Sequence, residues 1–402
     1  MNRLLSVLSI FFLCGCASGC SNGDADPIAN DDITSLHKSI IEYAHNQLML
    51  MVHSVDSMNA AGKDYFMPVS LSDRRLLGGA IYDWRSGFYP GILWQMYGLE
   101  KDAMWKELAI LQTRKLEDAC TYSKHDLGFM FNNSYGKAYE ETKDQYYKGI
   151  LIKAAETLKA RYNPNVGCIK SWNTSRKFDF PVIIDNMMNL ELLFHVTTLT
   201  GDSSFWKIAC SHADLTMKNH FRSDGSSYHV VDYDSITGNV IQKRTNQGYS
   251  DESYWSRGQA WGLYGFTMCY RFTHEDKYLC QAKRIADFLM SLNYADDLIP
   301  YWDMLSPDIP NTVRDASSAA IMASAFIELS NFCNDDFGKT IQERAKVLLE
   351  NLHTHYECKE GRDCGFLLGH STTSFMSSKE VDVPLIYADY YYLEAVSRLR
   401  EL

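Results

Sequence analysis

One short pattern recurs along the chain and limits what it can fold into. Where one amphipathic segment ends, an aspartate begins the next, and an aromatic side chain follows within three residues. The copies are Asp102 with Trp105, Asp144 with Tyr147, Asp202 with Phe205, Asp276 with Tyr278 and the looser pair Asp336 with Phe337. Such an aspartate accepts hydrogen bonds from the first N–H groups of a helix, so each copy predicts a short turn between antiparallel helices.

Amphipathic segments around these turns predict twelve helices. They cover residues 37–58, 91–99, 103–120, 127–140, 145–162, 186–199, 203–219, 257–272, 277–293, 316–333, 338–355 and 385–400. A length of 402 residues alone would suggest two or three domains. Repeated helical hairpins favour one, because six hairpins can close into a ring. We therefore expect an all-α fold, an (α/α)6 barrel with the even-numbered helices inside.

Polar and aromatic clusters stand at the beginnings of the even-numbered helices. They are residues 84–90, His125 with Asp126, Asp185, residues 255–261, Arg314 with Asp315, and residues 380–384. Parallel inner helices bring their N-termini to one end of the ring, so these clusters should converge at one mouth. A concave site with helix N-termini suits a small, polar, anionic ligand.

Asp185 is the one acid in an otherwise apolar stretch, FPVIIDNMMNLELLF, at residues 180–194. It falls in the first turn of a helix that is apolar around much of its circumference. Burying a carboxyl group there costs free energy unless the group is paired or used. One interpretation is a helix cap that accepts backbone N–H bonds. The other is a catalytic acid, and the stretch alone leaves both open.

A β-hairpin is predicted within residues 222–249. Two alternating runs, SSYHVVDYD and NVIQKR, flank a turn at residues 237–239, and we expect this hairpin to lie over the mouth. His229 in the first run could donate to a ligand, or it could be a strand histidine without a role. The same two alternatives hold for Gln247, just beyond the hairpin.

Four aromatic side chains lie in the clusters at the mouth. They are Trp84, Tyr89, Trp255 and Trp261. Taken singly, each is typical of a core residue. Their clustering near arginines, Arg257 among them, predicts one or two faces for stacking a sugar.

The N-terminus has the pattern of an export signal. A positive charge is followed by about ten apolar residues, too few to span a bilayer, which needs about 20. Residues 1–16 resemble a bacterial lipoprotein signal with Cys16 as the lipidated residue and Cys20 as the alternative; a plainly cleaved signal is the other interpretation. The pattern of residues 17–33 indicates a flexible tether, and that of 34–402 the catalytic barrel domain. We expect a lipid-anchored protein of the bacterial cell envelope, on the periplasmic side or the surface.

Other function classes find little support. Eight cysteines follow the signal without a CxxC pair, and the histidines are scattered, so we expect no metal and no cofactor. Cys358 and Cys364 flank a polar loop and could be bridged in an oxidising compartment. The net charge is −11 and no basic stripe occurs, which argues against nucleic-acid binding.

Five longer stretches carry a resemblance to a known family. They are HDLGFMF at 125–131, IIDNMMNLELL at 183–193, QGYSDESYWSRGQAWGLYGF at 247–266, RDASSAAIMASAF at 314–326 and VDVPLIYADYYYLEA at 381–395. In this order they resemble the unsaturated glucuronyl hydrolases of glycoside hydrolase family 88, over about residues 35–400. That family has an (α/α)6 barrel, in agreement with the helix count.

The resemblance implies roles for individual residues. Asp185 would be the general acid and base, and Asp126 would assist it. The pocket for the unsaturated uronate would contain His229, Gln247, Arg257 and Trp261, with Trp84 stacking against the sugar. The acid must be protonated at the working pH, so its pKa must exceed about 4. Burial and Asp126 would raise that pKa while Arg257 and the helix N-terminus would lower it; we expect it raised and Asp126 ionised.

Ser374, Ser377 and Lys379 match a Ser-x-x-Ser-x-Lys pattern that some family members use to hold a sulfate. A solvated loop is the other interpretation of these residues. With the sulfate site, the expected substrate is a sulfated glycosaminoglycan disaccharide with an unsaturated uronate. Two alternatives stay open, an unsaturated galacturonyl-rhamnose hydrolase of pectin breakdown and a lipoprotein that only binds glycan. The presence of both Asp126 and Asp185 argues against the second.

Overall fold

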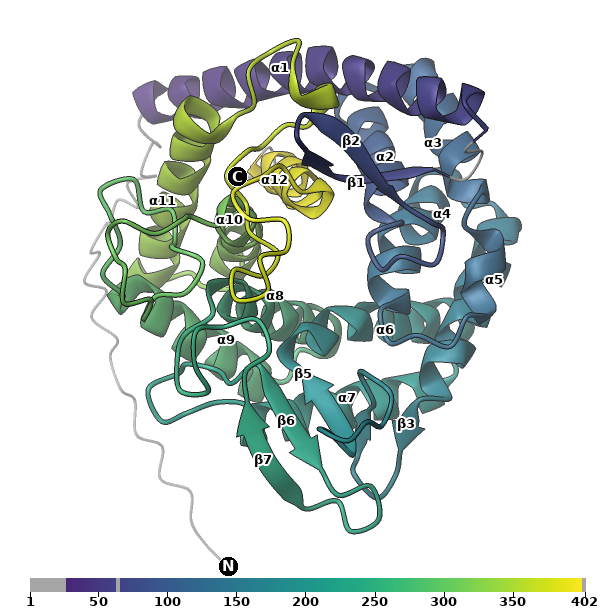
Figure 1. Cartoon of the computed structure of the whole chain (residues 1–402), viewed down its shortest axis with the longest axis vertical. Coiled ribbons are helices and arrows are strands. Elements are labelled where there is room, and N and C mark those ends of the chain that lie inside the picture. Colours follow the sequence, from purple (N-terminus) through teal and green to yellow (C-terminus); the bar gives the residue numbers. More distant parts are fainter. Residues whose placement is uncertain (1–26, 63–65, 400–402) are drawn as a thin grey trace, which may run out of the picture.

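The computed structural model describes residues 27–62 and 66–399, and it forms a ring of helices around a central axis (Figure 1). The helices are α1 (Pro27–Ala60), α2 (Phe88–Glu100), α3 (Ala103–Arg114), α4 (Lys137–Thr142), α5 (Gln145–Lys159), α6 (Leu190–Thr200), α7 (Ser203–Asn219), α8 (Ser256–Thr273), α9 (Asp276–Ser291), α10 (Ala316–Ser330), α11 (Asp336–Asn351) and α12 (Ile386–Leu399). The predicted (α/α)6 barrel is confirmed, with the even-numbered helices inside.

The inner and outer helices differ in which faces they bury. Every residue of α10 is buried, whereas α11 buries only every third or fourth residue. A helix that is apolar all round must be enclosed by others, and an amphipathic one covers them from outside. The composition of each helix therefore assigns it to the inner or the outer ring.

Three of the recurring aspartates cap helices as expected. Asp102, Asp144 and Asp202 each accept a hydrogen bond from the backbone N–H two residues on, at 2.9, 2.9 and 2.8 Å. The prediction for Asp276 is wrong, because Glu275 occupies the N-cap of α9 and Asp276 lies in its first turn. An acid in the first turn of a helix still interacts favourably with the helix dipole. An aspartate in the first turn therefore gives nearly the same sequence pattern as an aspartate at the N-cap.

The segment before α4 is helical with a different geometry from the one expected. Residues Gly128–Gly136 form a π-helix, η2, which continues into α4. Its first residue packs so closely that a Cβ on Gly128 would lie 2.3 Å from Cα of Asn189. The backbone N–H of Phe129 donates to Oδ1 of the same Asn189 at 3.1 Å. π-Turns of this kind often occur at functional sites, and this one faces the mouth.

The predicted hairpin is present and belongs to a larger sheet. Strands β6 (Val230–Tyr233) and β7 (Val240–Arg244) pair antiparallel, and β5 (Phe180–Ile183) adds a third strand beside β6. Figure 1 shows this sheet on the rim of the ring, beside the opening. Strands β1 (Met67–Ser72) and β2 (Arg75–Gly79), and the two-residue pair β3 (Tyr162–Asn163) and β4 (Cys168–Ile169), were not predicted. Since β5 runs directly into Asp185, the sheet fixes the approach to that residue.

The ring closes where α1 meets the C-terminal part of the chain. The hydroxyl of Tyr43 donates to the carbonyl oxygens of Cys358 and Leu367, both at 2.8 Å. Nε2 of Gln47 donates to the carbonyl oxygen of Phe366 at 2.8 Å. Gly365, at φ +87°, lies against the backbone of α1. Partners about 315 residues apart in the sequence therefore hold the two ends together.

The possible bridge between Cys358 and Cys364 is not formed. Cys358 and Cys364 are both free thiols. Their loop is held by hydrogen bonds to α1 instead, and burial raises the pKa of the Cys358 thiol. Helix α1 begins at Pro27, within the range predicted for the tether, and proline is well suited to the first turn of a helix.

The predicted signal at residues 1–16, Cys16, Cys20 and the rest of the tether lie outside the described residues. None of the helices in residues 27–62 and 66–399 is long and apolar enough to cross a bilayer.

Candidate active site

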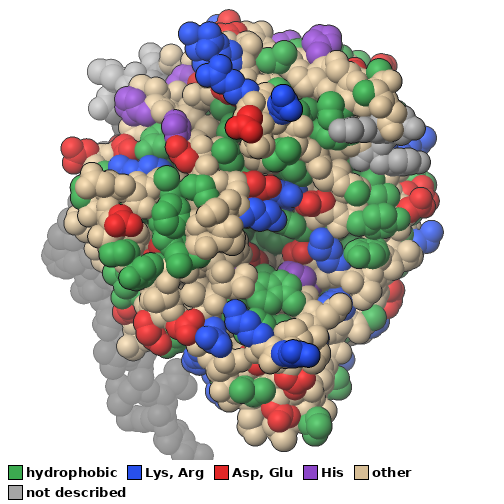
Figure 2. Space-filling model, in the orientation of Figure 1, with side chains coloured by type: hydrophobic (Ala, Val, Ile, Leu, Met, Phe, Trp, Pro, Cys, Tyr) green, Lys and Arg blue, Asp and Glu red, His purple; other side chains and the backbone are tan. Residues whose placement is uncertain are grey.

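A cavity of about 360 Å³ opens at the end of the ring where the inner helices begin. It is lined by Trp84, His125, Asp126, Phe129, Trp172, Ile183, Asp185, Asn246, Gln247, Arg257, Thr373, Ser374, Ser377 and Lys379. Figure 2 shows a hollow at the centre of this face with acidic and basic side chains gathered around it. Four of the six predicted clusters contribute to this cavity, and both candidate carboxylates face the same space, whereas Arg314 and Asp382 of the other two clusters line a separate groove.

Asp185 lies in a short 3-10 turn, η3 (Ile184–Asn189), directly after β5. Ile183 occupies the N-cap, and Oδ2 of Asp185 has no hydrogen-bond partner among the described residues. The interpretation of this carboxyl as a helix cap is therefore wrong. Its side chain is 15% exposed, enough for contact with the cavity.

The environment of Asp185 favours its protonated form. Burial raises the pKa of this carboxyl to about 7, and the negative charge of Asp126 acts in the same direction. The charge of Arg257 and the backbone N–H of Asp185 itself oppose this rise. The expected direction is confirmed, and the dominant cause is loss of water around the carboxyl group.

The imidazole ring of His229, which lies beside Asp185, has one defined tautomer. Its Nδ1 accepts the backbone N–H groups of Asn246 and Gln247, at 3.1 and 3.2 Å. The proton of the neutral ring is therefore on Nε2, which lies 3.7 Å from Oδ2 of Asp185. Burial lowers the pKa of His229 to about 3, so the ring is neutral at ordinary pH. His229 directly precedes β6 and is buried behind the cavity wall, with its Nε2 directed at the acid and without a hydrogen-bond partner among the described residues.

Arg257 is a fixed cation at the start of α8. It pairs with Asp315 at 3.0 Å and donates to the carbonyl oxygens of Thr372 and Thr373, at 2.5 and 2.6 Å. Gln247 donates to the carbonyl oxygen of Thr373 as well, at 2.7 Å. These contacts join the start of α8 to the start of α10 and to the segment that precedes α12. They hold one guanidinium at the wall of the cavity.

The four aromatic residues predicted at the mouth divide into one lining residue and three supports. Trp84 lines the cavity. Tyr89 and Trp261 are buried below it, at 1% and 0% exposure. Trp255 packs against His229 in a tilted arrangement with ring centroids 4.4 Å apart. Trp84 is thus the one predicted sugar-stacking surface that faces the cavity, among the described residues.

The segment from Ser374 to Lys379 forms a closed loop. The backbones of these two residues exchange two hydrogen bonds, each 3.0 Å, and Oγ of Ser377 donates to Oγ of Ser374 at 2.8 Å. All three side chains of the Ser-x-x-Ser-x-Lys pattern line the cavity. On the outer side of the loop, Phe375 stacks on Trp302 with centroids 4.7 Å apart. The loop forms one wall of the cavity, and Ser377 and Lys379 are exposed to solvent, so both interpretations of the motif stay open.

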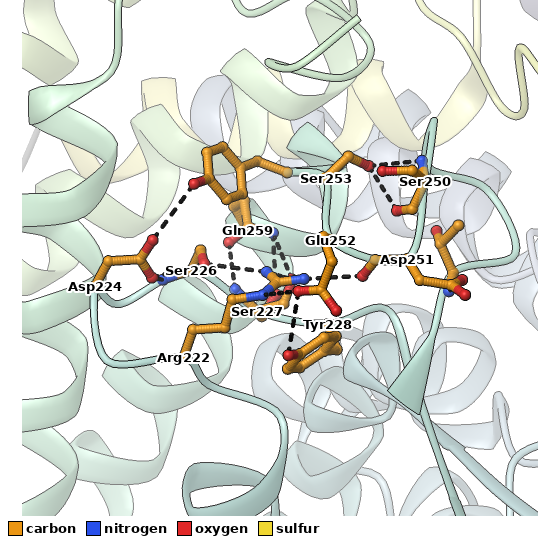
Figure 3. Close-up of polar contacts among 12 residues, drawn as sticks. Arg222, Asp224, Ser226, Ser227, Tyr228, Ser250, Asp251, Glu252, Ser253 and Gln259 are labelled. Carbon is orange, nitrogen blue, oxygen red and sulfur yellow. Dashed lines mark hydrogen bonds and ion pairs between the residues drawn. The ribbon is translucent and has the colours of Figure 1, made fainter. Parts of the chain in front are cut away.

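A polar network ties together the two segments that carry His229 and Arg257 (Figure 3). Arg222 pairs with Glu252 at 3.2 Å and donates to the carbonyl oxygen of Asp251 at 2.9 Å. The backbone N–H of Ser227 donates to Oε1 of Gln259 at 2.8 Å. The loop before β6 is thus joined to the loop before α8 and to α8 itself. This network connects the segment that carries His229 to the segment that carries Arg257.

Sequence reasoning assigned no site role to several lining residues, namely Phe129, Trp172, Asn246 and Thr373. Phe129 carried a signal, since it lies within HDLGFMF. Trp172 and Thr373 lie in irregular segments whose path depends on the tertiary fold, so no local pattern marks them. Within residues 27–62 and 66–399, no group of three or more His, Cys, Asp or Glu side chains is arranged to hold a metal ion.

Comparisons with known proteins agree with this site. The profile of Glycosyl Hydrolase Family 88 matches residues 63–392. An unsaturated glucuronyl hydrolase of Formosa agariphila is 44% identical over 325 residues, which is 80% of either chain. An unsaturated chondroitin disaccharide hydrolase of Streptococcus pyogenes serotype M1 is 33% identical over 79% of this chain and 81% of its own.

A solved structure shares the fold as well. The crystal structure of an unsaturated glucuronyl hydrolase specific for heparin has a TM-score of 0.86 and 38% identity. The alignment covers 92% of this chain and 98% of that one. The family match, the identity and the shared barrel all point the same way: the chain belongs to glycoside hydrolase family 88.

Proposed function

We propose that this protein removes the 4,5-unsaturated uronic acid from the non-reducing end of oligosaccharides produced by polysaccharide lyases, and that Asp185 is its acid and base. The protein is an unsaturated glucuronyl hydrolase, as its family and relatives indicate. The reaction adds water to the C4=C5 double bond, which is an enol ether, and is not a direct displacement at C1.

One carboxyl group can serve both steps of this reaction. Protonated Asp185 gives its proton to C4, which places positive charge on C5 and the ring oxygen. Water then adds to C5, and the carboxylate of Asp185 takes its proton, which restores the acid. The hemiketal formed at C5 opens and the next sugar leaves. Because attack occurs at C5, the carboxylate-separation rule for retaining and inverting glycosidases does not apply.

The observation that carries this assignment is the state of Asp185 in the cavity. Its pKa of about 7 leaves much of the carboxyl protonated near neutral pH, so a proton is available for the alkene carbon. Arg257 lines the same cavity as a cation for the substrate carboxylate, and Nε2 of His229 lies 3.7 Å from Oδ2 of Asp185. Since the whole protein carries a net charge of −11, these local donors must attract the anionic substrate.

The test is the isosteric substitution Asp185→Asn. We expect this variant to lose nearly all turnover, because an amide cannot donate and regain the proton. Substrate should still raise its melting temperature, since the pocket is unchanged. Turnover is followed by loss of absorbance of the conjugated double bond. Asp202→Asn, at a helix cap away from the cavity, is the control and should remain active. A near wild-type rate for Asp185→Asn would refute the assignment.

We further propose that the substrate is a sulfated glycosaminoglycan disaccharide, with Ser374, Ser377 and Lys379 holding a sulfate on the neighbouring sugar. Two hydroxyls and an ammonium group at one wall of the cavity suit a sulfate. The relatives are named for chondroitin and heparin substrates, which supports this class.

Lys379→Met tests the sulfate site. The variant should lose about ten-fold in kcat/KM on the sulfated disaccharide and little on the unsulfated one, because only the sulfate contact is removed. A panel of lyase products measures this ratio. Equal losses on both disaccharides would contradict the site, and activity on unsaturated galacturonyl-rhamnose alone would point to pectin breakdown.

We also propose that the protein is exported to the cell envelope and anchored by lipid at Cys16. The support is the sequence pattern of residues 1–16. Labelling with a radioactive fatty acid should mark the wild-type protein and not Cys16→Ser. A label retained in Cys16→Ser and lost in Cys20→Ser would move the anchor to Cys20.

A further inference from the structure

A buried arginine joins the start of α2 to the loop that ends at Lys379. Arg85 is 6% exposed and stands directly after Trp84, the aromatic residue that lines the cavity. Its guanidinium donates to the two carboxylate oxygens of Asp83, at 2.9 and 3.0 Å, and to Oε1 of Glu380 at 2.7 Å. Since Glu380 directly follows Lys379, one guanidinium connects the segments that bring Trp84 and Lys379 to the cavity.

The second oxygen of the Glu380 carboxylate continues this connection into the loop. Oε2 of Glu380 accepts from the hydroxyl of Thr373 at 2.7 Å, and the backbone N–H of Thr373 donates to the carbonyl oxygen of Glu380 at 2.9 Å. Thr373 lies directly before Ser374, whose backbone pairs with that of Lys379. The carboxylate therefore spans the two ends of the loop, with one oxygen on Arg85 and the other on Thr373.

The backbone of this loop needs such contacts to keep its shape. Ser378 has φ +51° and Glu380 has φ +47°, in the left-handed region that costs free energy for residues other than glycine. Conformations of this kind persist where surrounding contacts hold them. The charged hydrogen bond from Arg85 to Glu380 is a strong contact of this type.

We propose that Arg85 and Glu380 are positioning residues that set the preference of the enzyme for a sulfated sugar. They act through the loop: their ion pair holds the Ser374–Lys379 loop relative to Trp84, so that the sugar ring and its sulfate are bound at one spacing. This inference rests on the proposed sulfate site and adds to it the two residues that hold the site in place.

The uronate end of the cavity has separate supports. Arg257 pairs with Asp315 at 3.0 Å and donates to the carbonyl oxygen of Thr372, and neither contact involves Glu380. Loss of the Glu380 carboxylate should therefore weaken the hold on the sulfate and leave the binding of the unsaturated uronate nearly unchanged. An effect on one substrate and not on the other distinguishes this role from a general loss of structure.

The experiment measures kcat and KM of Glu380→Ala on a sulfated and an unsulfated unsaturated disaccharide. In this variant Arg85 keeps its pairing with Asp83, whereas the loop loses its charged anchor. We expect kcat/KM on the sulfated disaccharide to fall about five-fold, through a higher KM, and to change little on the unsulfated one. A fall in kcat on both disaccharides would overturn the proposal.

A double variant with Lys379→Met tests the route of the effect. If Glu380 acts through the loop, adding Glu380→Ala to Lys379→Met should cause almost no further loss on the sulfated disaccharide, because the contact that Glu380 positions is already absent. Losses that multiply in the double variant would show that Glu380 acts elsewhere. A normal preference in Glu380→Ala beside a sulfate-dependent loss in Lys379→Met would refute only the positioning role. Equal losses on both disaccharides in Lys379→Met would refute the sulfate site itself.

Asp382→Asn is the matched control, because Asp382 lies two residues beyond Glu380 and also has positive φ, at +55°. Its carboxylate pairs with His370 at 2.8 Å, and it lines the separate groove. Its preference between the two disaccharides should remain that of the wild type. If Glu380→Ala is too unstable to assay, Glu380→Gln keeps the shape of the side chain without its charge. That variant should show the same change in preference to a smaller extent, and an unchanged preference would count against the proposal.

Discussion

The burial that makes Asp185 useful as an acid also lowers the stability of the fold. The pKa of this carboxyl is about 7 in the folded protein, against 3.8 for an ordinary exposed aspartate. Between these values the folded chain holds a proton that the unfolded chain has released. Stability therefore falls as pH rises from about 4 to 7 and stays low above it. Such a cost is common at sites where function fixes the residue.

Asp185→Asn should accordingly stabilise the protein at alkaline pH. We expect the free energy of unfolding at pH 8 to rise by roughly 2–4 kcal/mol, since the amide has no charge to bury. At pH 4 the two proteins should be nearly equal. Urea unfolding at the two pH values measures the difference. The same gain at both pH values would show that the cause is packing and not ionisation.

Several residues of the site could be predicted from the sequence, each from a different signal. Asp185 stood out as a lone acid in an apolar stretch, and Arg257 belonged to a long family motif. The tautomer of His229 was not predictable, because it depends on two backbone N–H groups 17 and 18 residues further on. Trp172 lies between two short strands, where no periodicity marks its direction.

At the scale of elements, the long helices were predictable because their apolar periodicity reports which face is buried. The π-helix η2 was not, since its turn differs from an α-helix by one residue and depends on the contact between Gly128 and Asn189. The small sheets escaped prediction for a similar reason. Strands such as β3 and β4 have only two residues each, and their pairing is set by the helices around them.

An aromatic contact on its outer side holds the loop from Ser374 to Lys379 in position. Phe375 stacks on Trp302 and lines a second, larger groove of about 660 Å³ that contains neither Asp126 nor Asp185. We expect Phe375→Ala to release the loop and to reduce kcat/KM on the sulfated disaccharide several-fold through a higher KM. Rates on the unsulfated disaccharide should change little. Met376→Ala, next to it and exposed, is the control. A fall in kcat alone on both substrates would contradict this role.

At the scale of the whole molecule, stability depends on closing the ring. Gly365 has φ +87°, and a Cβ there would lie 2.2 Å from the backbone nitrogen of Met51 on α1. No other residue fits without moving α1 away from the C-terminal segment. Gly361, in the same loop, also has positive φ, at +75°, and a Cβ there would meet nothing within 4 Å.

Gly365→Ala should therefore destabilise the protein far more than Gly361→Ala. Both variants bear the cost of a left-handed backbone, about 1 kcal/mol. Only Gly365→Ala forces the ends of the ring apart, and we expect a total loss of about 3 kcal/mol or more. Chemical denaturation compares the two. Equal losses would mean that the contact with α1 adjusts without cost.

Because the Tyr43 hydroxyl of α1 donates to the carbonyl oxygens of Cys358 and Leu367, α1 lacks these partners until the ribosome has passed Leu367. Until then, the apolar side of this helix is exposed to solvent in the nascent chain. A truncation shortly before Cys358 would leave that side exposed permanently. Premature termination late in the message should thus yield aggregates or targets for proteolysis, and not a slightly weakened enzyme.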